Sequence, residues 1–424
     1  MKFYKSIEAF ALLALISFPA FILVNRYIAG ATFLLSMLLG CLLFIRQRKF
    51  LPALSQEEVF FLLSLSLLTC SLLITAAVNQ VELTKLDRLI MPLLGIPVYF
   101  LYRGLRLSEG WLWCGLAVGA VMAGLVALYQ MMPGAGFDRA GGITNPIMFG
   151  DISLVMGFMS MAGCGWFFQQ RRWVGAMPFV ALVFGLLASA LSLSRGGWLS
   201  LPLALLLLSW FFARRLSWQK MLFAVFFVIA AVALIYQAPQ SKVKQRVELT
   251  LNNLQAYQES TNVDDPVRLS GLGIRLDMWK TSLHIFAENP FFGVGWGAYA
   301  EAAREYVELG LVGESVALFP HPHNQFLSAL AKGGVFGLLA LLLFMGIPLF
   351  LFSRQLLNPA ASEETRRVAL AAVLFLLSFI AFAVTEAVFE RSRMMTFYAF
   401  YLLVLMALMQ VSARLGPVSQ QDKP

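Results

Sequence analysis

The chain alternates between long apolar stretches and short polar interruptions, the pattern of a protein that crosses a membrane many times. A stretch of about 17–25 apolar residues is long enough to cross roughly 30 Å of hydrocarbon as a helix. The pattern predicts twelve spans, near residues 7–24, 28–45, 58–78, 88–102, 111–132, 146–168, 173–193, 197–213, 219–236, 324–352, 366–389 and 394–412. We therefore expect an all-α polytopic membrane protein.

One connection differs from the short turns between the other spans. Residues 237–322 form a segment of about 86 residues with mixed polarity, which includes helix-like stretches near 275–287 and 297–309. A loop of this length is usually functional or folded, so we expect it to be partly helical and to lie on the membrane face. The predicted organisation is nine spans in residues 1–236, the large loop in 237–322, and three spans with a short tail in 323–424.

Composition excludes a soluble globular protein. Apolar side chains make up 59% of the chain, charged ones make up 13%, and the mean hydropathy is +0.76. Soluble domains average about 45–50% apolar and about 25% charged residues. The surplus apolar residues must therefore face lipid.

The charge pattern predicts the orientation in the membrane. The net charge is +9, but Lys and Arg occur in short clusters between apolar stretches, so nucleic-acid binding is not indicated. Seventeen of them fall in alternate connections and at both ends of the chain, against seven in the intervening short turns. Since cytoplasmic loops retain positive residues, we expect cytoplasmic termini and a periplasmic large loop. That loop holds seven basic and ten acidic residues, so any anion bound there must depend on individually placed arginines.

Cysteine and histidine are distributed unevenly. All four cysteines lie within predicted spans, which gives no sign of a disulfide framework or a thiolate metal site. The three histidines, His284, His321 and His323, all fall in the large loop or at its edge. Imidazole chemistry is therefore expected outside the cytoplasm.

His323 is the first candidate for chemistry. Pro322 suits the first position of a helix, which would place His323 in the first turn and Gly334 and Gly337 below it on the same face. Such glycines allow a neighbouring helix to approach closely, and the positive helix end favours the neutral imidazole that a general base needs. The alternative, equally open on spacing alone, is an interfacial histidine above packing glycines.

Arg195 is the second candidate. It lies in a very short turn between two apolar stretches, so its guanidinium must sit close to the membrane surface, where a charge is costly and often functional. The neighbouring Gly196 and Gly197 would expose backbone N–H groups beside it, and this combination suits an anion such as phosphate. A snorkelling arginine at a span end is the alternative.

Arg275 and a glycine run follow in the large loop. Arg275 and Trp279 share one face of a predicted helix, although a solvated surface arginine would give the same pattern. Glycines 293, 295 and 297 alternate before the next predicted helix and would suit an anion cradle. They are not a dinucleotide fingerprint, because no βαβ unit surrounds them.

Several further charged residues occur near the outer surface. Glu386 lies about a turn inside the last-but-one span and needs a basic partner such as Arg391 or Arg195, so a structural ion pair is expected. Asp151, and Arg88 with its neighbour Asp87, are similar and could line an outer cavity.

These motifs together resemble the O-antigen ligase and polymerase superfamily. The spacing His323-Asn324, nine residues, Gly334, two residues, Gly337 matches that superfamily's signature where its large periplasmic loop returns to the membrane. Three further motifs occur in the order found in that superfamily: Arg195-Gly196-Gly197, Arg275 four residues before Trp279, and Asn289-Pro290 leading to Gly293-Val294-Gly295. The resemblance covers essentially the whole chain and is strongest to the O-antigen ligases.

The resemblance implies a metal-independent, inverting glycosyltransferase with a GT-C-like fold and no cofactor. The implied donor is a polysaccharide on undecaprenyl diphosphate, and the acceptor is a sugar hydroxyl of lipid A-core, in the inner membrane of a Gram-negative bacterium. His323 would act as general base or orient the acceptor, with support from Asn324. Arg195 and Arg275 would offset the charge of the leaving diphosphate.

Alternative functions remain open from the sequence. Polymerases of the superfamily usually carry two sizeable periplasmic loops, and protein O-oligosaccharyltransferases commonly carry a further C-terminal portion, which we do not expect here. A transporter or flippase of lipid-linked glycan is the alternative from another class. It should show paired broken helices or an internal repeat, and neither is evident.

Overall fold

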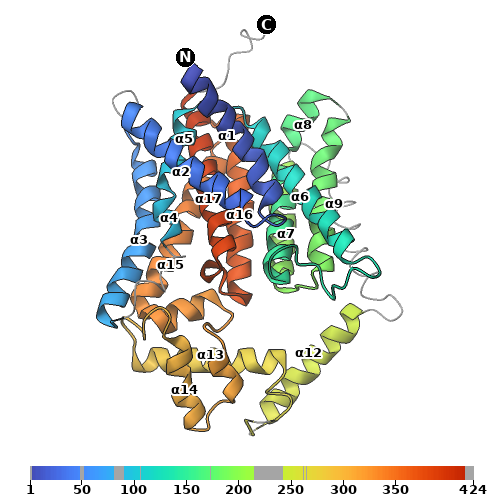
Figure 1. The fold of residues 1–424 in the computed structure, drawn as a ribbon, viewed down its shortest axis with the longest axis vertical. Helices are drawn as coiled ribbons and strands as arrows, with labels where there is room; N and C mark the ends of the chain where they lie inside the picture. Colours follow the sequence, from blue (N-terminus) through green and yellow to red (C-terminus); the bar gives the residue numbers. More distant parts are fainter. Residues whose placement is uncertain are drawn as a thin grey trace.

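The computed structural model describes residues 2–47, 52–80, 90–105, 107–171, 173–213, 242–260, 262–263 and 265–415. Within these ranges every regular element is a helix (Figure 1). In chain order the helices are α1 (Lys2–Phe21), α2 (Ile28–Gln47), α3 (Gln56–Val78), α4 (Met91–Leu94), α5 (Ile96–Gly104), α6 (Gly110–Gln130), α7 (Pro146–Ala162), α8 (Cys164–Gln170), η2 (Val174–Ala176), α9 (Met177–Leu191), η3 (Gly196–Leu199), α10 (Ser200–Ala213), α12 (Lys242–Glu259), α13 (Gly271–Glu288), α14 (Tyr299–Glu308), η4 (Glu314–Leu318), α15 (Gln325–Leu357), α16 (Glu363–Thr385), η5 (Val388–Glu390) and α17 (Ser392–Leu415). The all-α prediction is thus confirmed for the described chain.

The described helices supply fewer membrane spans than the twelve predicted. Nine are long and apolar enough to cross a membrane, and α7 with α8, bent by 57°, makes a tenth if the pair is one span. These ten coincide with ten of the predicted spans. The predicted span 219–236 lies outside the described residues.

The predicted span 88–102 is the remaining difference. Its described part consists of the short helices α4 and α5, which meet at Gly95. Pro97 follows that junction and has no N–H with which to continue the hydrogen bonding of a helix. The described part of the predicted span therefore consists of two pieces, each too short by itself to cross a membrane.

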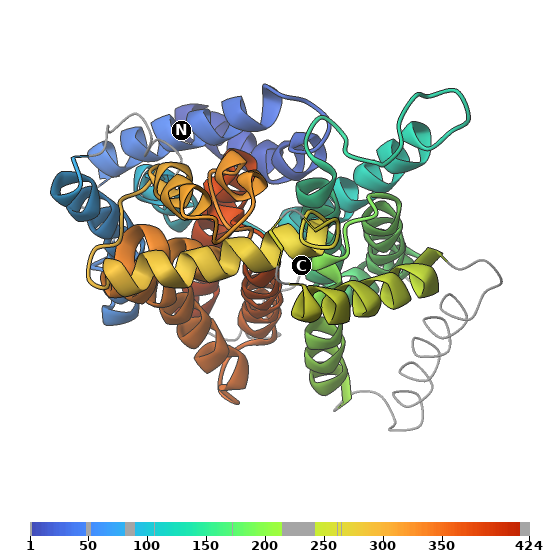
Figure 2. The same cartoon turned by 90° about the horizontal axis from the view of Figure 1, so that it is seen from below.

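Helices α16 and α17 form the centre of the bundle (Figures 1 and 2). Within their most apolar windows, 78% and 89% of the residues are buried, against 28–39% for the outer spans α1, α2, α9 and α10. Aromatic rings pack between them, including Phe375 and Phe379 against Tyr398. The segment that joins α16 to α17 is therefore anchored on both sides by helices that are largely buried inside the bundle.

The helices of the large loop lie across one end of this bundle, and α1 begins at the opposite end (Figure 1). Helix α13 crosses that end (Figure 2) and starts after Ser270, whose side chain accepts a hydrogen bond from Gly273 N–H. Its buried residues Met278 and Ile285 share a small core with Tyr299 of α14 and Ala331 of α15. The helices expected near 275–287 and 297–309 are confirmed as α13 and α14.

Helix α15 is broken at Gly334, which has φ 60° and ψ −155°. The turn that follows Asn289 fills the break: Val335 N–H donates to the Pro290 carbonyl (2.8 Å), and Gly295 N–H donates to the Lys332 carbonyl (2.9 Å). A side chain at Gly334 would overlap the backbone of Phe291. This glycine therefore accommodates a loop and a change of chain direction, not the neighbouring helix expected from its spacing.

Candidate active site

His323 lies just before a helix and not in its first turn, so the predicted helix start at Pro322 is wrong. Asn324 is the N-cap of α15, and its side chain accepts hydrogen bonds from Phe326 and Leu327 N–H, each 3.0 Å long. His323 has φ 50°, a left-handed conformation that no helix can continue. The predicted face of an imidazole above Gly334 and Gly337 is lost as a consequence.

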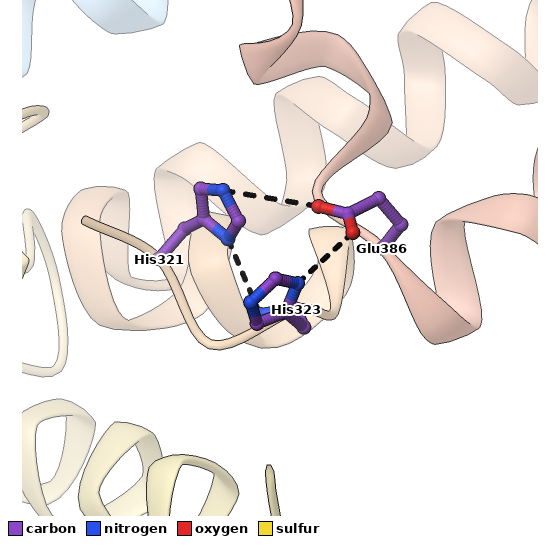
Figure 3. Close-up of side chains that lie close together, drawn as sticks. All are labelled: His321, His323 and Glu386. Carbon is purple, nitrogen blue, oxygen red and sulfur yellow. Dashed lines mark hydrogen bonds and ion pairs between the residues drawn. The ribbon is translucent and has the colours of Figure 1, made fainter. Parts of the chain in front are cut away.

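His323, His321 and Glu386 form one cluster (Figure 3). The Nδ1 atom of His323 lies 2.9 Å from Oε2 of Glu386, and Nε2 of His321 lies 3.8 Å from Oε1 of the same carboxylate. The backbone N–H of His323 also points to Nδ1 of His321, at 3.4 Å. Glu386 directly follows α16, so the cluster joins the end of the large loop to the centre of the bundle.

The carboxyl group of Glu386 is ionised despite its burial. Only 3% of the side chain is exposed, which by itself raises the pKa, but the hydrogen bond from His323 and the charge of Arg391 outweigh burial and hold the pKa at about 2. Arg391 Nη2 lies 3.4 Å from Glu386 Oε1. The expected pairing of Glu386 with Arg391 is thereby confirmed, and Glu386 has the further role of contacting both histidines.

His321 is a buried neutral base. Burial lowers its pKa to about 4, against the opposing pull of the carboxylates of Glu390 and Glu386. Only 3% of its side chain is exposed, whereas 13% of the His323 side chain is exposed. Of the two imidazoles at Glu386, His323 is therefore the one accessible to a substrate.

A cavity of about 610 Å³ opens in front of His323 and collects the two predicted arginines. Arg195 and Gly196 enter it from the turn before α10, Arg275 from α13, and His323 from the loop before α15. The full lining is Arg139, Ile147, Leu193, Ser194, Arg195, Gly196, Asn253, Gly271, Leu272, Ile274, Arg275, Met278, Phe319, His323 and Thr385. Three sequence motifs that lie up to 128 positions apart thus face one space.

The elements around the cavity explain the position of each group. Trp279, one turn after Arg275, donates its indole N–H to the carbonyl of Pro322 (3.0 Å), which ties α13 to the histidine loop. Gly196 packs against Thr385 at the end of α16, where any side chain would overlap the Thr385 hydroxyl. Within the described residues no carboxylate lies within ion-pair distance of Arg275. Its guanidinium therefore forms no ion pair with a carboxylate of the described residues.

Arg139 is a lining residue that the sequence reasoning treated only as a charge in an outer turn. Its Nε–H donates to the carbonyl of Ser192 (2.9 Å), in the turn that carries Arg195. The arginine follows the glycine-rich stretch that begins at Gly134, and Gly134 and Gly136 both have positive φ. The glycine-rich stretch is the feature of the sequence that points to this contact, because it allows the chain to fold back over the turn that carries Arg195.

A second buried network, also not foreseen, supports the cluster from below. Lys332 Nζ lies 2.7 Å from Glu390 Oε2, and Ser328 donates to the other oxygen of Glu390. Gln325 accepts from Phe389 N–H at 2.9 Å. These contacts attach η5 to the first turns of α15, so the segment that follows Glu386 is tied to the helix that follows His323.

Other predicted cavity residues lie elsewhere. Asp151 is buried inside α7 beneath η3, and Gly197 packs directly on its carboxyl group, so neither lines the cavity. Glu386 stands behind His323, and Arg391 lines a neighbouring pocket. Arg88, like Asp87, lies outside the described residues.

The glycine run after Asn289 is not an anion cradle in this structure. Gly293 N–H donates to Asn289, and Val294 and Gly295 N–H donate to carbonyls of α15. Amides that are bonded in this way are not available to a ligand. The glycines serve the break in α15 instead.

Two histidines and one carboxylate are also a ligand set suited to a divalent metal. The ligand atoms of His321, His323 and Glu386 all lie within 4.8 Å of one another. Two of these groups already contact each other, since Nδ1 of His323 is at hydrogen-bond distance from Glu386, and Nδ1 of His321 accepts from the His323 backbone. The geometry suits a hydrogen-bonded cluster as it stands.

Comparisons with known proteins agree with the motifs. Residues 180–342 match the family model described as O-Antigen ligase, a range that includes Arg195, Arg275 and His323 and ends before Glu386. Over 361 residues, 85% of this chain and 88% of the relative, the sequence is 24% identical to an uncharacterized protein of Haemophilus influenzae.

A second relative has a named activity. Over 190 residues, 44% of this chain and 32% of the relative, the sequence is 27% identical to the ComP-specific O-oligosaccharyltransferase of Acinetobacter baylyi. The resemblance stated from the His323 motif is confirmed: this multi-pass membrane protein carries an O-antigen ligase family domain in residues 180–342.

Proposed function

We propose that this protein is a membrane glycosyltransferase that transfers a polysaccharide from undecaprenyl diphosphate to a sugar hydroxyl of lipid A-core, as an O-antigen ligase. The observation that carries the proposal is the single cavity in which the accessible imidazole of His323 faces the arginines Arg195 and Arg275. One group of this site accepts a proton and the others bind a phosphate, which is what glycosyl transfer from a lipid diphosphate requires.

The chemistry assigns a role to each group. Glu386 accepts the Nδ1–H of His323, which leaves the Nε2 lone pair free to take the proton of the acceptor hydroxyl. The acceptor oxygen bonds to the anomeric carbon as the bond from that carbon to the phosphate oxygen breaks. The bonding electron pair leaves with the diphosphate, and attack from the opposite face would invert the anomeric centre.

Arginines take the part that a divalent metal plays in other diphosphate-leaving reactions. Two guanidiniums supply paired N–H donors for phosphate oxygens and stabilise the charge that develops on the leaving group. Arg139, beside the turn of Arg195, adds a third positive charge at the same cavity. The proposed reaction therefore needs no metal ion.

The proposed location is the inner membrane of a Gram-negative bacterium, with cytoplasmic termini and the cavity facing the periplasm. The distribution of Lys and Arg supports this orientation. The position of α13 and α14, at the end of the bundle opposite the start of α1, agrees with it (Figure 1).

A protein O-oligosaccharyltransferase is the second candidate, because a protein with that printed activity is among the relatives. The two functions share the donor and differ in the acceptor hydroxyl. The same cavity and the same proton acceptor would serve either reaction. A polymerase, which would use a second lipid-linked glycan as the acceptor, is a third possibility of the same kind.

Transfer by the purified protein tests the proposal. Radiolabelled glycan on undecaprenyl diphosphate is offered with lipid A-core, with a pilin substrate, or with donor alone. We expect label in lipid A-core, and loss of that label in His323→Ala by about 10²–10⁴-fold. Label in pilin only, or in a longer lipid-linked glycan only, would contradict the ligase assignment, and near-normal transfer by His323→Ala would contradict the role of the imidazole.

A further inference from the structure

A second pocket is lined by Arg391, the arginine that contacts Glu386. Its volume is about 450 Å³, and it is lined by Ile22, Asn25, Arg26, Ala29, Gly30, Met148, Arg391, Ser392, Arg393 and Thr396. Arg26 comes from the turn between α1 and α2, and the other two arginines come from the junction of η5 with α17. Nothing in the proposed transfer reaction uses this space.

The pocket concentrates positive charge. Three of its lining side chains are arginines, and none of the residues that line it is acidic. Arg26 and Arg393 are close enough for their charges to repel each other. An anion in this space would offset that repulsion.

The arginines keep donors available for that anion. Arg391 contacts Glu386 through Nη2 only, and its buried Nε–H has no hydrogen-bond partner among the described residues. Arg393 donates through Nη1 to the carbonyl of Ile143 at 2.8 Å. Because a guanidinium has five N–H donors in a planar fork, both side chains can bind phosphate oxygens without losing these contacts.

The position of the pocket indicates which anion it binds. Arg26 lies between the candidate spans that end at Phe21 and begin at Ile28, and Arg393 lies at the start of the span of α17. Span ends lie at the level of lipid headgroups, where lipid phosphates are found. Ile22 and Ala29 add an apolar wall beside the charges, which suits an amphiphile better than a free ion.

We propose that the pocket of Arg26, Arg391 and Arg393 binds the phosphate group of a membrane lipid. Arg391 serves this site and the proton-transfer cluster together, because it lies 3.4 Å from the carboxylate that holds His323. A bound phosphate shares Arg391 with Glu386. Binding of a lipid phosphate therefore changes the charge that acts on Glu386 and, through it, on the imidazole of His323.

Binding of dioctanoyl phosphatidic acid to the full-length protein in neutral detergent tests the proposal, with dioctanoylglycerol as the uncharged matched ligand. We expect the phosphorylated lipid to bind at least tenfold more tightly, and the double variant Arg26→Gln/Arg393→Gln to lose at least tenfold of that affinity. Arg304→Gln, which removes an exposed arginine of α14, is the control and should bind as wild type. Equal affinity for both lipids, or an unchanged affinity in the double variant, would overturn the proposal.

A second variant protects the test against misfolding. Arg26→Lys/Arg393→Lys keeps the charges but loses the planar fork, so it should fold and bind with intermediate affinity. If it binds no better than the Gln pair while its melting temperature equals that of wild type, charge at these positions does not bind the phosphate and the proposal fails.

Two sources of lipid phosphate are distinguished by competition. If the phosphate belongs to the acceptor glycolipid, phosphatase treatment of that lipid weakens its binding to wild type, and excess phosphatidylglycerol does not displace it. If the phosphate belongs to bulk phospholipid, phosphatidylglycerol displaces the probe fully. These are binding measurements, so a wild-type protein that binds the probe but transfers no glycan would contradict the proposed function and leave the lipid site standing.

Discussion

Glu386 holds His323 and Arg391 at the same time, with Oε2 2.9 Å from Nδ1 of the histidine and Oε1 3.4 Å from Nη2 of the arginine. The carboxylate thus fixes which imidazole nitrogen carries the proton. The second nitrogen of His323 is left for the acceptor. A residue that the sequence suggested as a structural ion pair is, in this geometry, the group that orients the proposed base.

Replacement of Glu386 by Gln should lower transfer by about 10²-fold or more, because the amide can present its NH₂ group to Nδ1 and favour the wrong tautomer. Initial rates of glycan transfer measure the effect. Glu386→Asp should recover part of the activity, since it keeps the charge.

Glu57→Gln is the matched control for this change, because Glu57 pairs with the exposed Arg354 far from the cavity. It should leave transfer unchanged. Full activity in Glu386→Gln would show that the carboxylate does not orient the imidazole.

Arg195→Gln and Arg275→Gln should each raise the KM for the lipid-linked donor and lower kcat, by about tenfold or more in kcat/KM, because each removes a charged donor for the diphosphate. The Lys variants should retain part of the activity, since an ammonium keeps the charge without the paired N–H geometry. Steady-state kinetics with the donor varied check this, and an effect on the acceptor KM alone would contradict the assignment.

The lowered pKa of His321 predicts that the protein loses stability in mild acid. This pKa is about 4 in the folded protein and 6.5 without burial. Between those values the unfolded chain binds a proton that the folded chain does not, so stability falls as the pH drops from 6.5 toward 4, by up to about 3 kcal/mol. The melting temperature in detergent, measured between pH 4.5 and 7, reports this fall.

His321→Asn should flatten that pH dependence, because the side chain no longer titrates. The wild-type slope would then belong to His321. An identical slope in the variant would instead assign the effect to other groups.

Gly334→Ala should destabilise the protein by more than about 2 kcal/mol, because an L side chain is strained at φ 60° and the added Cβ overlaps the backbone of Phe291. Gly346→Ala, also in α15, meets no atom within 4 Å and should be neutral or slightly stabilising. Melting temperatures of the two variants give the comparison. Equal values would show that the break in α15 does not require a glycine at position 334.

Transfer should persist in EDTA, because Arg195 and Arg275 carry the leaving-group charge in the proposed reaction. Excess Zn²⁺ should inhibit, since it would bind the imidazole and carboxylate atoms of His321, His323 and Glu386 that the reaction uses as a hydrogen-bonded cluster. Loss of activity in EDTA, restored by a divalent metal, would make the cluster a metal site.

The sequence predicted the spans well because apolar length is a property of each segment alone. The segment near 88–102 is different, because its described part consists of two short helices and the hydropathy pattern does not register the junction between them. The helices of the large loop were foreseen for the same local reasons, down to the face that carries Arg275 and Trp279.

The site was only partly predictable, since it depends on contacts between distant segments. Spacing alone placed His323 in a helix, but the side chain of Asn324 caps α15 one residue later and leaves the histidine in a left-handed turn. The partnership of His323 with Glu386 spans 63 positions, and the role of Arg139 depends on a glycine-rich loop that folds over Ser192. The first leaves no local pattern, and for the second the glycine-rich stretch marks only a bend in the chain and not the contact with Ser192.

The break in α15 limits how this protein can be recombined with its relatives. The turn after Asn289 supplies backbone hydrogen bonds to residues 331–336, and Gly334 gives it room. A chimera with a junction between these two segments would combine the turn of one parent with the broken helix of the other. Functional chimeras should therefore exchange residues 289–337 as one block, and domain-swap experiments on specificity are best designed around that unit.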